Sequence, residues 1–80
     1  MIYQNQMVIS YLMSGKTLTP LEALNMFGCL RLAARVYELR SDGWPILKEM
    51  KRHPINEHIY FAEYYLDPDK SQWPTTSDAL

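Results

Sequence analysis

The sequence predicts a single, mainly α-helical domain that ends in a small β-hairpin, and three observations predict it. Apolar residues recur with helical spacing in three successive segments between residues 4 and 41. After Gly43 the period changes from 3.6 towards 2, and a run rich in aromatic and β-branched residues follows at 59–66. The 80 residues are 48 % hydrophobic and 21 % charged, a balance typical of one globular domain.

The first predicted helix spans residues 4–14. Its apolar residues recur at i, i+1, i+4 and i+5 and form one stripe, which consists of Met7, Val8, Tyr11 and Leu12. Gly15 supplies a C-terminal stop, because glycine adopts the backbone conformation that ends a helix.

The second predicted helix is short and has a well-marked start. Thr19 can cap it, Pro20 fits its first position, and Glu22 completes a capping box. Its apolar face consists of Ala23, Leu24 and Phe27. Gly28 follows after about two turns, where a tight bend requires a residue that tolerates positive φ.

The third predicted helix spans residues 30–41 and ends before Gly43. Leu32, Val36 and Leu39 recur at i, i+4 and i+7 and are expected to face inward, with Ala33 beside them. A brief turn containing glycine separates this helix from the second. That arrangement is typical of a helix-turn-helix unit.

The remaining chain predicts a hairpin and a tail. We expect residues 44–51 to pair with 58–66, with an exposed polar loop at 52–57 that forms a wing. Alternation in the second strand should place one set of side chains on the core side, namely Tyr60, Ala62, Tyr64 and Leu66. The predicted architecture is therefore a winged helix-turn-helix domain (three-helix core plus wing) over residues 1–66. Residues 67–80 are expected to form a flexible or loosely packed polar tail.

The segment 19–43, TPLEALNMFGCLRLAARVYELRSDG, resembles a family of small bacterial and bacteriophage winged helix-turn-helix DNA-binding proteins. The resemblance extends over residues 4–66 and is densest in the second and third helices, at Thr19, Glu22, Ala23, Gly28, Arg31, Leu32, Ala34, Arg35, Leu39, Arg40 and Gly43. It implies a DNA-binding module that is often encoded by a phage or prophage. The wing departs from the pattern, because Glu57 and Glu63 are acidic where relatives often carry basic residues.

Arg31 and Arg35 are the predicted base-reading residues. They lie four positions apart, so in a continuous helix both project from the face opposite Leu32 and Val36. The third helix of such a unit enters the major groove, where arginine pairs in bidentate fashion with guanine. The alternative is that both arginines are solvated or pair with nearby carboxylates, those of Glu38 and Glu22.

Phosphate contacts are predicted at the start of the second helix, in the basic run of the hairpin and at Arg40. At the start of the second helix the backbone amides attract anions, and the residues there are Lys16, Thr17 and Thr19. Thr19 also has a purely structural role as a helix cap. The most basic run of the hairpin contains Lys48, Lys51, Arg52 and His53. Arg40 completes the set, although a cation near a helix C-terminus is also stabilising without DNA.

A second surface is predicted to bind a protein. The core can cover only one face of the hairpin, so the side chains of the other face need the tail or another subunit to cover them. The candidate dimer or partner surface consists of Ile59, Phe61, Tyr65 and Trp73. The formal net charge of −1 is unusual for a DNA-binding domain and favours the alternative of a protein-interaction module that docks a host or phage protein.

Other function classes are not indicated. Cys29 is the only cysteine, and His53 and His58 have no further ligands at metal-binding spacing, so we expect no metal, cofactor or small-molecule ligand. No enzymatic motif and no membrane-spanning run is present. The sequence therefore predicts a non-enzymatic, cytoplasmic protein that binds specific double-stranded DNA through its third helix, most simply a small transcriptional regulator.

Overall fold

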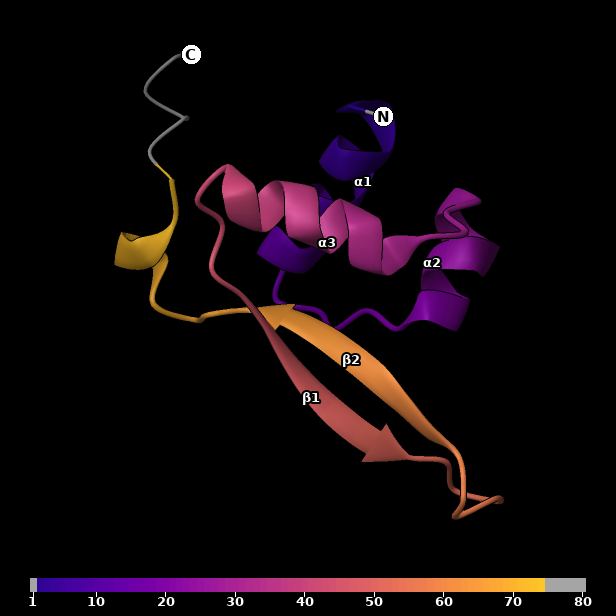
Figure 1. The fold of residues 1–80 in the computed structure, drawn as a ribbon. Helices are drawn as coiled ribbons and strands as arrows, with labels where there is room; N and C mark the ends of the chain where they lie inside the picture. Colours follow the sequence, from indigo (N-terminus) through magenta and orange to yellow (C-terminus); the bar gives the residue numbers. More distant parts are fainter. Residues whose placement is uncertain (1, 75–80) are drawn as a thin grey trace.

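Three helices precede a two-stranded antiparallel hairpin and a short 3-10 helix in the computed structural model, which describes residues 2–74 (Figure 1). The elements are α1 (Ile2–Met13), α2 (Pro20–Phe27), α3 (Leu32–Ser41), β1 (Ile46–Arg52), β2 (Tyr60–Leu66) and η1 (Lys70–Gln72). Helix α3 crosses in front of α1, and the hairpin extends away from the three helices. The predicted combination of a three-helix core and a hairpin wing is confirmed.

Local sequence features determine both ends of α2. The Thr19 hydroxyl accepts a hydrogen bond from the Glu22 amide, and the Glu22 carboxylate accepts one from the Thr19 amide, which completes the predicted capping box. Gly28 has a φ of 66° and donates from its amide to the carbonyl of Leu24. This left-handed residue ends α2 and redirects the chain, because other residues are strained at positive φ.

Helix α3 starts two residues later than predicted. Arg31 has a φ of −130° and a ψ of 67°, so it lies at the N-cap outside the helix. Cys29, just before it, is buried in the predicted role of a small core residue. Because Arg31 lies outside the helix, it does not share a helical face with Arg35.

The hairpin pairs Ile46 with Leu66 at one end and Arg52 with Tyr60 at the other. Leu18, in the connection between α1 and α2, adds a bridge to the second strand. Its amide donates to the carbonyl of Tyr64 at 2.9 Å, and the Tyr64 amide donates to the carbonyl of Leu18 at 2.8 Å. This bridge, which no local sequence feature predicts, attaches the hairpin to the α1–α2 connection.

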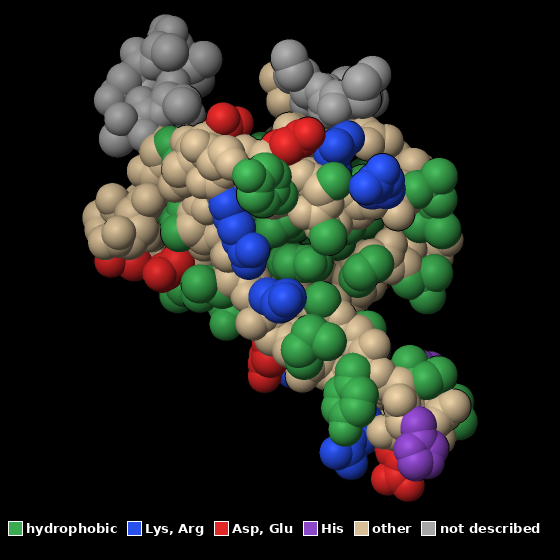
Figure 2. Space-filling model, in the orientation of Figure 1, with side chains coloured by type: hydrophobic (Ala, Val, Ile, Leu, Met, Phe, Trp, Pro, Cys, Tyr) green, Lys and Arg blue, Asp and Glu red, His purple; other side chains and the backbone are tan. Residues whose placement is uncertain are grey.

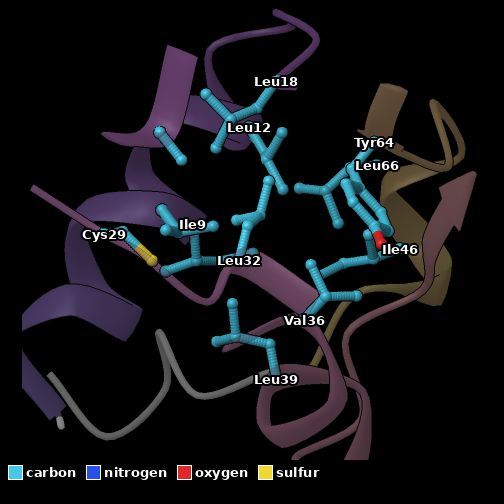
Figure 3. Packing of buried hydrophobic residues seen from close by; sticks show 12 residues of the cluster. Ile9, Leu12, Leu18, Cys29, Leu32, Val36, Leu39, Ile46, Tyr64 and Leu66 are labelled. Carbon is cyan, nitrogen blue, oxygen red and sulfur yellow. The ribbon is translucent and has the colours of Figure 1, made fainter. Parts of the chain in front are cut away.

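The core draws residues from all three helices, both strands and the connections (Figure 3). It consists of Val8, Ile9, Leu12, Leu18, Ala23, Cys29, Leu32, Val36, Leu39, Ile46, Tyr64 and Leu66. The predicted inward stripes of α1 and α3 are confirmed at Val8, Leu12, Leu32, Val36 and Leu39. Leu24 and Ala33 were expected to face inward but are exposed, because the core contacts α2 mainly through Ala23 and α3 through its other side.

Residues 67–74, the first part of the predicted flexible or loosely packed tail, pack against the domain. Trp73 packs against Trp44 with ring centroids 6.0 Å apart, and its indole Nε1 donates to the carbonyl of Asp67 at 2.8 Å. Residues 67–74 thus fold back on the domain, since an indole buries a large apolar area and its N–H has a partner. The rest of the predicted tail, residues 75–80, lies outside the described residues.

Candidate nucleic-acid interface

The exposed stripe of α3 consists of Ala33, Tyr37 and Arg40, which follow one another at i, i+4 and i+7. Leu32, Val36 and Leu39 occupy the opposite, buried side. The Tyr37 side chain is 72 % exposed although tyrosine is usually half-buried. Tyr37 was not among the predicted site residues, although the spacing of the inward stripe already indicates that it lies on the outer side.

The hairpin separates its charges by strand alternation. Its inner face, the one that meets the core, carries Ile46, Lys48, Met50, Arg52, Tyr60, Ala62, Tyr64 and Leu66. Its outer face carries Leu47, Glu49, Lys51, Phe61, Glu63 and Tyr65. Only the end nearest the helices is covered by the core, so Lys48 and Arg52 remain exposed on the inner face. Both strand glutamates lie on the outer face.

Exposed cations occur both on α3 and on the inner face of the hairpin next to it, and we call Arg40, Lys48 and Arg52 together the basic surface. Figure 2 shows Lys and Arg side chains over α3 and along the start of the hairpin, with apolar side chains between them. The acidic side chains at α3 have other partners or surroundings: Glu38 pairs with Arg35 and accepts a hydrogen bond from Asn5 of α1, and the C-cap residue Asp42 lines a groove with the same asparagine. Segregation of this kind gives a basic surface on a chain whose net charge is −1.

Arg31 is exposed at the N-cap of α3. It forms no ion pair within 4.0 Å with any residue of the described segment 2–74. The first turn of α3 is the part that reads bases in helix-turn-helix proteins. Arg31 is exposed immediately before that turn, so the prediction that it reads bases is compatible with its position.

Arg35 does not share an exposed stripe with Arg31, contrary to the sequence prediction. Its Nη2 lies 3.1 Å from Glu38 Oε2, and its side chain is only 15 % exposed. The cause is helical spacing, since Arg35 lies three residues after Leu32 and four before Leu39, next to the buried stripe, while Arg31 lies outside the helix at its N-cap. The arginine and Glu38, with Asn5 of α1, instead hold the two helices together.

Arg40 connects α3 to the hairpin. Its Nε donates a hydrogen bond of 2.9 Å to the carbonyl of Ile46, the first residue of β1. The residue as a whole stays exposed on the α3 surface. Arg40 therefore has a structural role in addition to the predicted phosphate contact.

The wing tip is organised by side chains that bond to the backbone. His53 Nδ1 accepts hydrogen bonds from the amides of Ile55 and Asn56, both at 3.1 Å. The Arg52 guanidinium lies 5.5 Å from the centre of the Tyr60 ring and donates to its hydroxyl at 3.1 Å. Arg52 remains exposed on the inner face, whereas the ring of His53 is used to hold the turn.

Lys51, a predicted phosphate contact, lies on the outer face, away from α3. Its Nζ is 3.5 Å from a Glu49 carboxylate oxygen and 3.9 Å from one of Glu63. Because strand side chains alternate, Lys48 and Lys51 point to opposite faces although both belong to one basic run. Lys48 takes the position on the inner face and forms no ion pair within the described segment.

The start of α2 is less suited to a phosphate than predicted. The Glu22 carboxylate already accepts from the Thr19 amide, and it places a negative charge at this helix end. Lys16 and Thr17 line a groove with Tyr65 and Lys70, next to the outer face of the hairpin. These residues therefore lie apart from the basic surface of α3.

The candidate partner surface divides into two parts. Trp73 is covered by Trp44 of its own chain, so this part needs no second subunit. Ile59 and Phe61 line a different groove together with the start of α2. Dimerisation through the four residues stays a prediction, which light scattering can test.

The described residues contain no group of three or more His, Cys, Asp or Glu side chains that could hold a metal ion. Within the same part of the chain, every helix is too short or too polar to cross a membrane.

Comparison with protein families gives one match. The family model described as winged helix-turn-helix domain matches residues 3–68, which is most of the chain. Neither the curated proteins nor the solved structures gave a match. The matched range contains α3, the whole hairpin and the inner-face cations.

Proposed function

This chain belongs to the winged helix-turn-helix domain family, and from that premise we propose that it is a non-enzymatic protein that binds specific double-stranded DNA. One observation carries the proposal: Arg40, an exposed residue of α3, is bonded to the first residue of β1, and the exposed cations Lys48 and Arg52 follow Ile46 on the same face of that strand. Phosphates flank the major groove on both sides, so cations beside an inserted helix are placed to hold it there.

In this proposal the N-terminal part of α3 enters the major groove. Arg31 would donate both of its guanidinium arms to guanine O6 and N7. Ala33 is small enough for the helix to approach closely, and the Tyr37 ring offers an apolar contact to base edges, including the thymine methyl group. Arg35 would support this reading helix through Glu38 and would not touch the bases.

The wing would contact the backbone beside the helix. Lys48 and Arg52 lie four residues apart on the inner face of β1. Arg40 lies where α3 meets this strand. Contacts of this kind position the protein without reading sequence. A small domain that recognises a site without an enzymatic motif fits a transcriptional regulator, including the phage or prophage regulators that the sequence resembles.

The direct test is selection of bound sequences from a random duplex library. We expect enrichment of one site, and affinity that falls steeply between 50 and 200 mM salt, because cation–phosphate contacts release counterions. A library that emerges without enrichment, together with no retention on heparin at low salt, would contradict the proposal. It would favour protein interaction as the main function.

A further inference from the structure

A groove separates the start of α2 from the outer face of the hairpin and its tip. It has a volume of about 590 Å³, and its lining consists of Thr19, Pro20, Leu21, Glu22, His53, Pro54, Ile59, Phe61 and Glu63. That volume is comparable to the volumes of pockets that bind drug-sized molecules. One wall comes from the start of α2 and the other from strand and turn residues of the hairpin. A peptide bound in the groove would therefore contact both the helix and the hairpin.

The lining exposes apolar side chains that the domain's own core does not use. Leu21 is 66 % exposed and Ile59 is 48 % exposed, while Phe61, on β2, is partly exposed. Small domains need nearly every apolar residue for stability. Exposed aliphatic and aromatic groups that gather in one groove therefore indicate a surface that another molecule covers.

The charge of the groove selects the kind of molecule. Glu22 and Glu63 line it, and Glu49 lies directly opposite Glu63 in the strand register. Lys51 is close to both strand glutamates, so Glu22, Glu49 and Glu63, at the groove or beside it on the strands, outnumber the ammonium that pairs with two of them. Duplex DNA would be repelled here, whereas a cationic group would be attracted.

We propose that this groove binds a basic, partly apolar segment of a partner protein. An aliphatic or aromatic side chain of the segment packs against Leu21 and Phe61, and a lysine or arginine nearby pairs with Glu63. The groove lies on the outer face, opposite Lys48 and Arg52, so its occupant leaves the basic surface free. The proposal does not depend on DNA binding by α3.

The test starts from a library of random 12-residue peptides displayed on phage and selected on the immobilised full chain. The selected peptides are expected to contain lysine or arginine within a few residues of leucine, phenylalanine or tryptophan. One such peptide is then synthesised with a fluorophore, and its affinity is measured by anisotropy. Selection of acidic peptides, or of none above background, overturns the proposal.

Matched variants locate the bound peptide. Glu63→Lys and Leu21→Ser should each weaken binding at least tenfold, and Glu63→Gln should weaken it less than Glu63→Lys. Glu57→Lys makes the same charge change at the hairpin tip, where this side chain is 75 % exposed and outside the groove lining, and should leave affinity within twofold. Circular dichroism checks the fold, and Leu21→Ser provides an exposed site whose replacement leaves the core intact. Equal affinity of the parent, Glu63→Lys and Leu21→Ser proteins overturns the proposal, even if α3 binds DNA.

Discussion

The guanidinium Nε of Arg40 donates a hydrogen bond of 2.9 Å to the carbonyl of Ile46 and so joins the last turn of α3 to the first residue of β1. This contact sets where the hairpin leaves the helices. Because Lys48 follows two residues later on the same face of the strand, the contact also places the inner-face cations beside α3. A single arginine thereby couples the orientation of the wing to the proposed reading helix.

Replacing Arg40 with methionine should lower the free energy of unfolding by about 1–2 kcal/mol, because a hydrogen bond from a charged donor to a part-buried carbonyl is lost. Methionine is chosen because it has an unbranched apolar side chain, as arginine has along its methylene groups, and a similar helix propensity. Urea denaturation measures the change. The matched control is Arg31→Met, where no such contact exists and the change should stay within about 0.5 kcal/mol. Equal effects in the two variants would show that the Arg40 contact contributes nothing to stability.

Lys48 and Lys51 provide a paired test of the basic surface. For Lys48→Ala, the slope of log K against log salt concentration for duplex binding should become shallower by about 1, since one phosphate contact is removed. For Lys51→Ala the slope should not change, because that ammonium lies on the outer face beside Glu49 and Glu63. The same loss of slope in both variants would rule out the inner face as the DNA-binding side.

Replacing Arg31 should affect DNA specificity, whereas replacing Arg35 should affect the stability of the fold. Arg31→Ala is expected to weaken binding to the selected site by about 1–3 kcal/mol while non-specific binding changes less. Arg35→Ala should instead lower the free energy of unfolding, with a coupling to Glu38 of about 0.5–1 kcal/mol in a double-mutant cycle. Binding titrations at a temperature where all variants are folded make the comparison. If Arg35→Ala alone removed discrimination between sites, the assignment of roles would be reversed.

Gly28 tests the turn between α2 and α3. Gly28→Ala should destabilise the domain by about 1–2 kcal/mol, because the φ of 66° strains any residue with a Cβ. The cost is conformational, since an added Cβ would meet no atom within 4 Å. Asparagine tolerates this conformation better, so Gly28→Asn should cost less than Gly28→Ala in thermal unfolding. The opposite order would contradict a left-handed backbone at this position.

Acid should loosen the segment that carries Trp73. The side-chain hydroxyl and then the amide of Ser71 donate to the Asp69 carboxylate and lower its pKa below the ordinary value of 3.8. A carboxyl whose pKa is depressed in the folded state stabilises that state fully above its unfolded value, and the stabilisation disappears as the pH falls through the folded value. We expect the near-ultraviolet circular dichroism of the tryptophans to change below pH 3.8. Asp69→Asn should lack this component of the change, and identical acid titrations of both proteins would refute it.

Much of the fold could be predicted because its signals are local. The capping box at Thr19 and Glu22 and the left-handed Gly28 act within a single turn of chain, and both were found as predicted. The inward stripe of α3 also follows from helical spacing alone. The bridge from Leu18 to Tyr64 could not be predicted, because neither residue carries a local feature that specifies its distant partner.

The sequence by itself determined the three helices, the turn between the last two, the hairpin and the charges available to it, since these depend on backbone preferences and spacing over a few residues. The tertiary structure decided which of those charges face outward together. Arg35 lies beside the buried stripe of α3 and pairs with Glu38, Arg31 lies outside the helix, and Lys48 is separated from Lys51 by the face of the strand that meets the core. The exposure of a side chain depends on which other residues pack against it, and these contacts form only when the helices and the hairpin come together around the core.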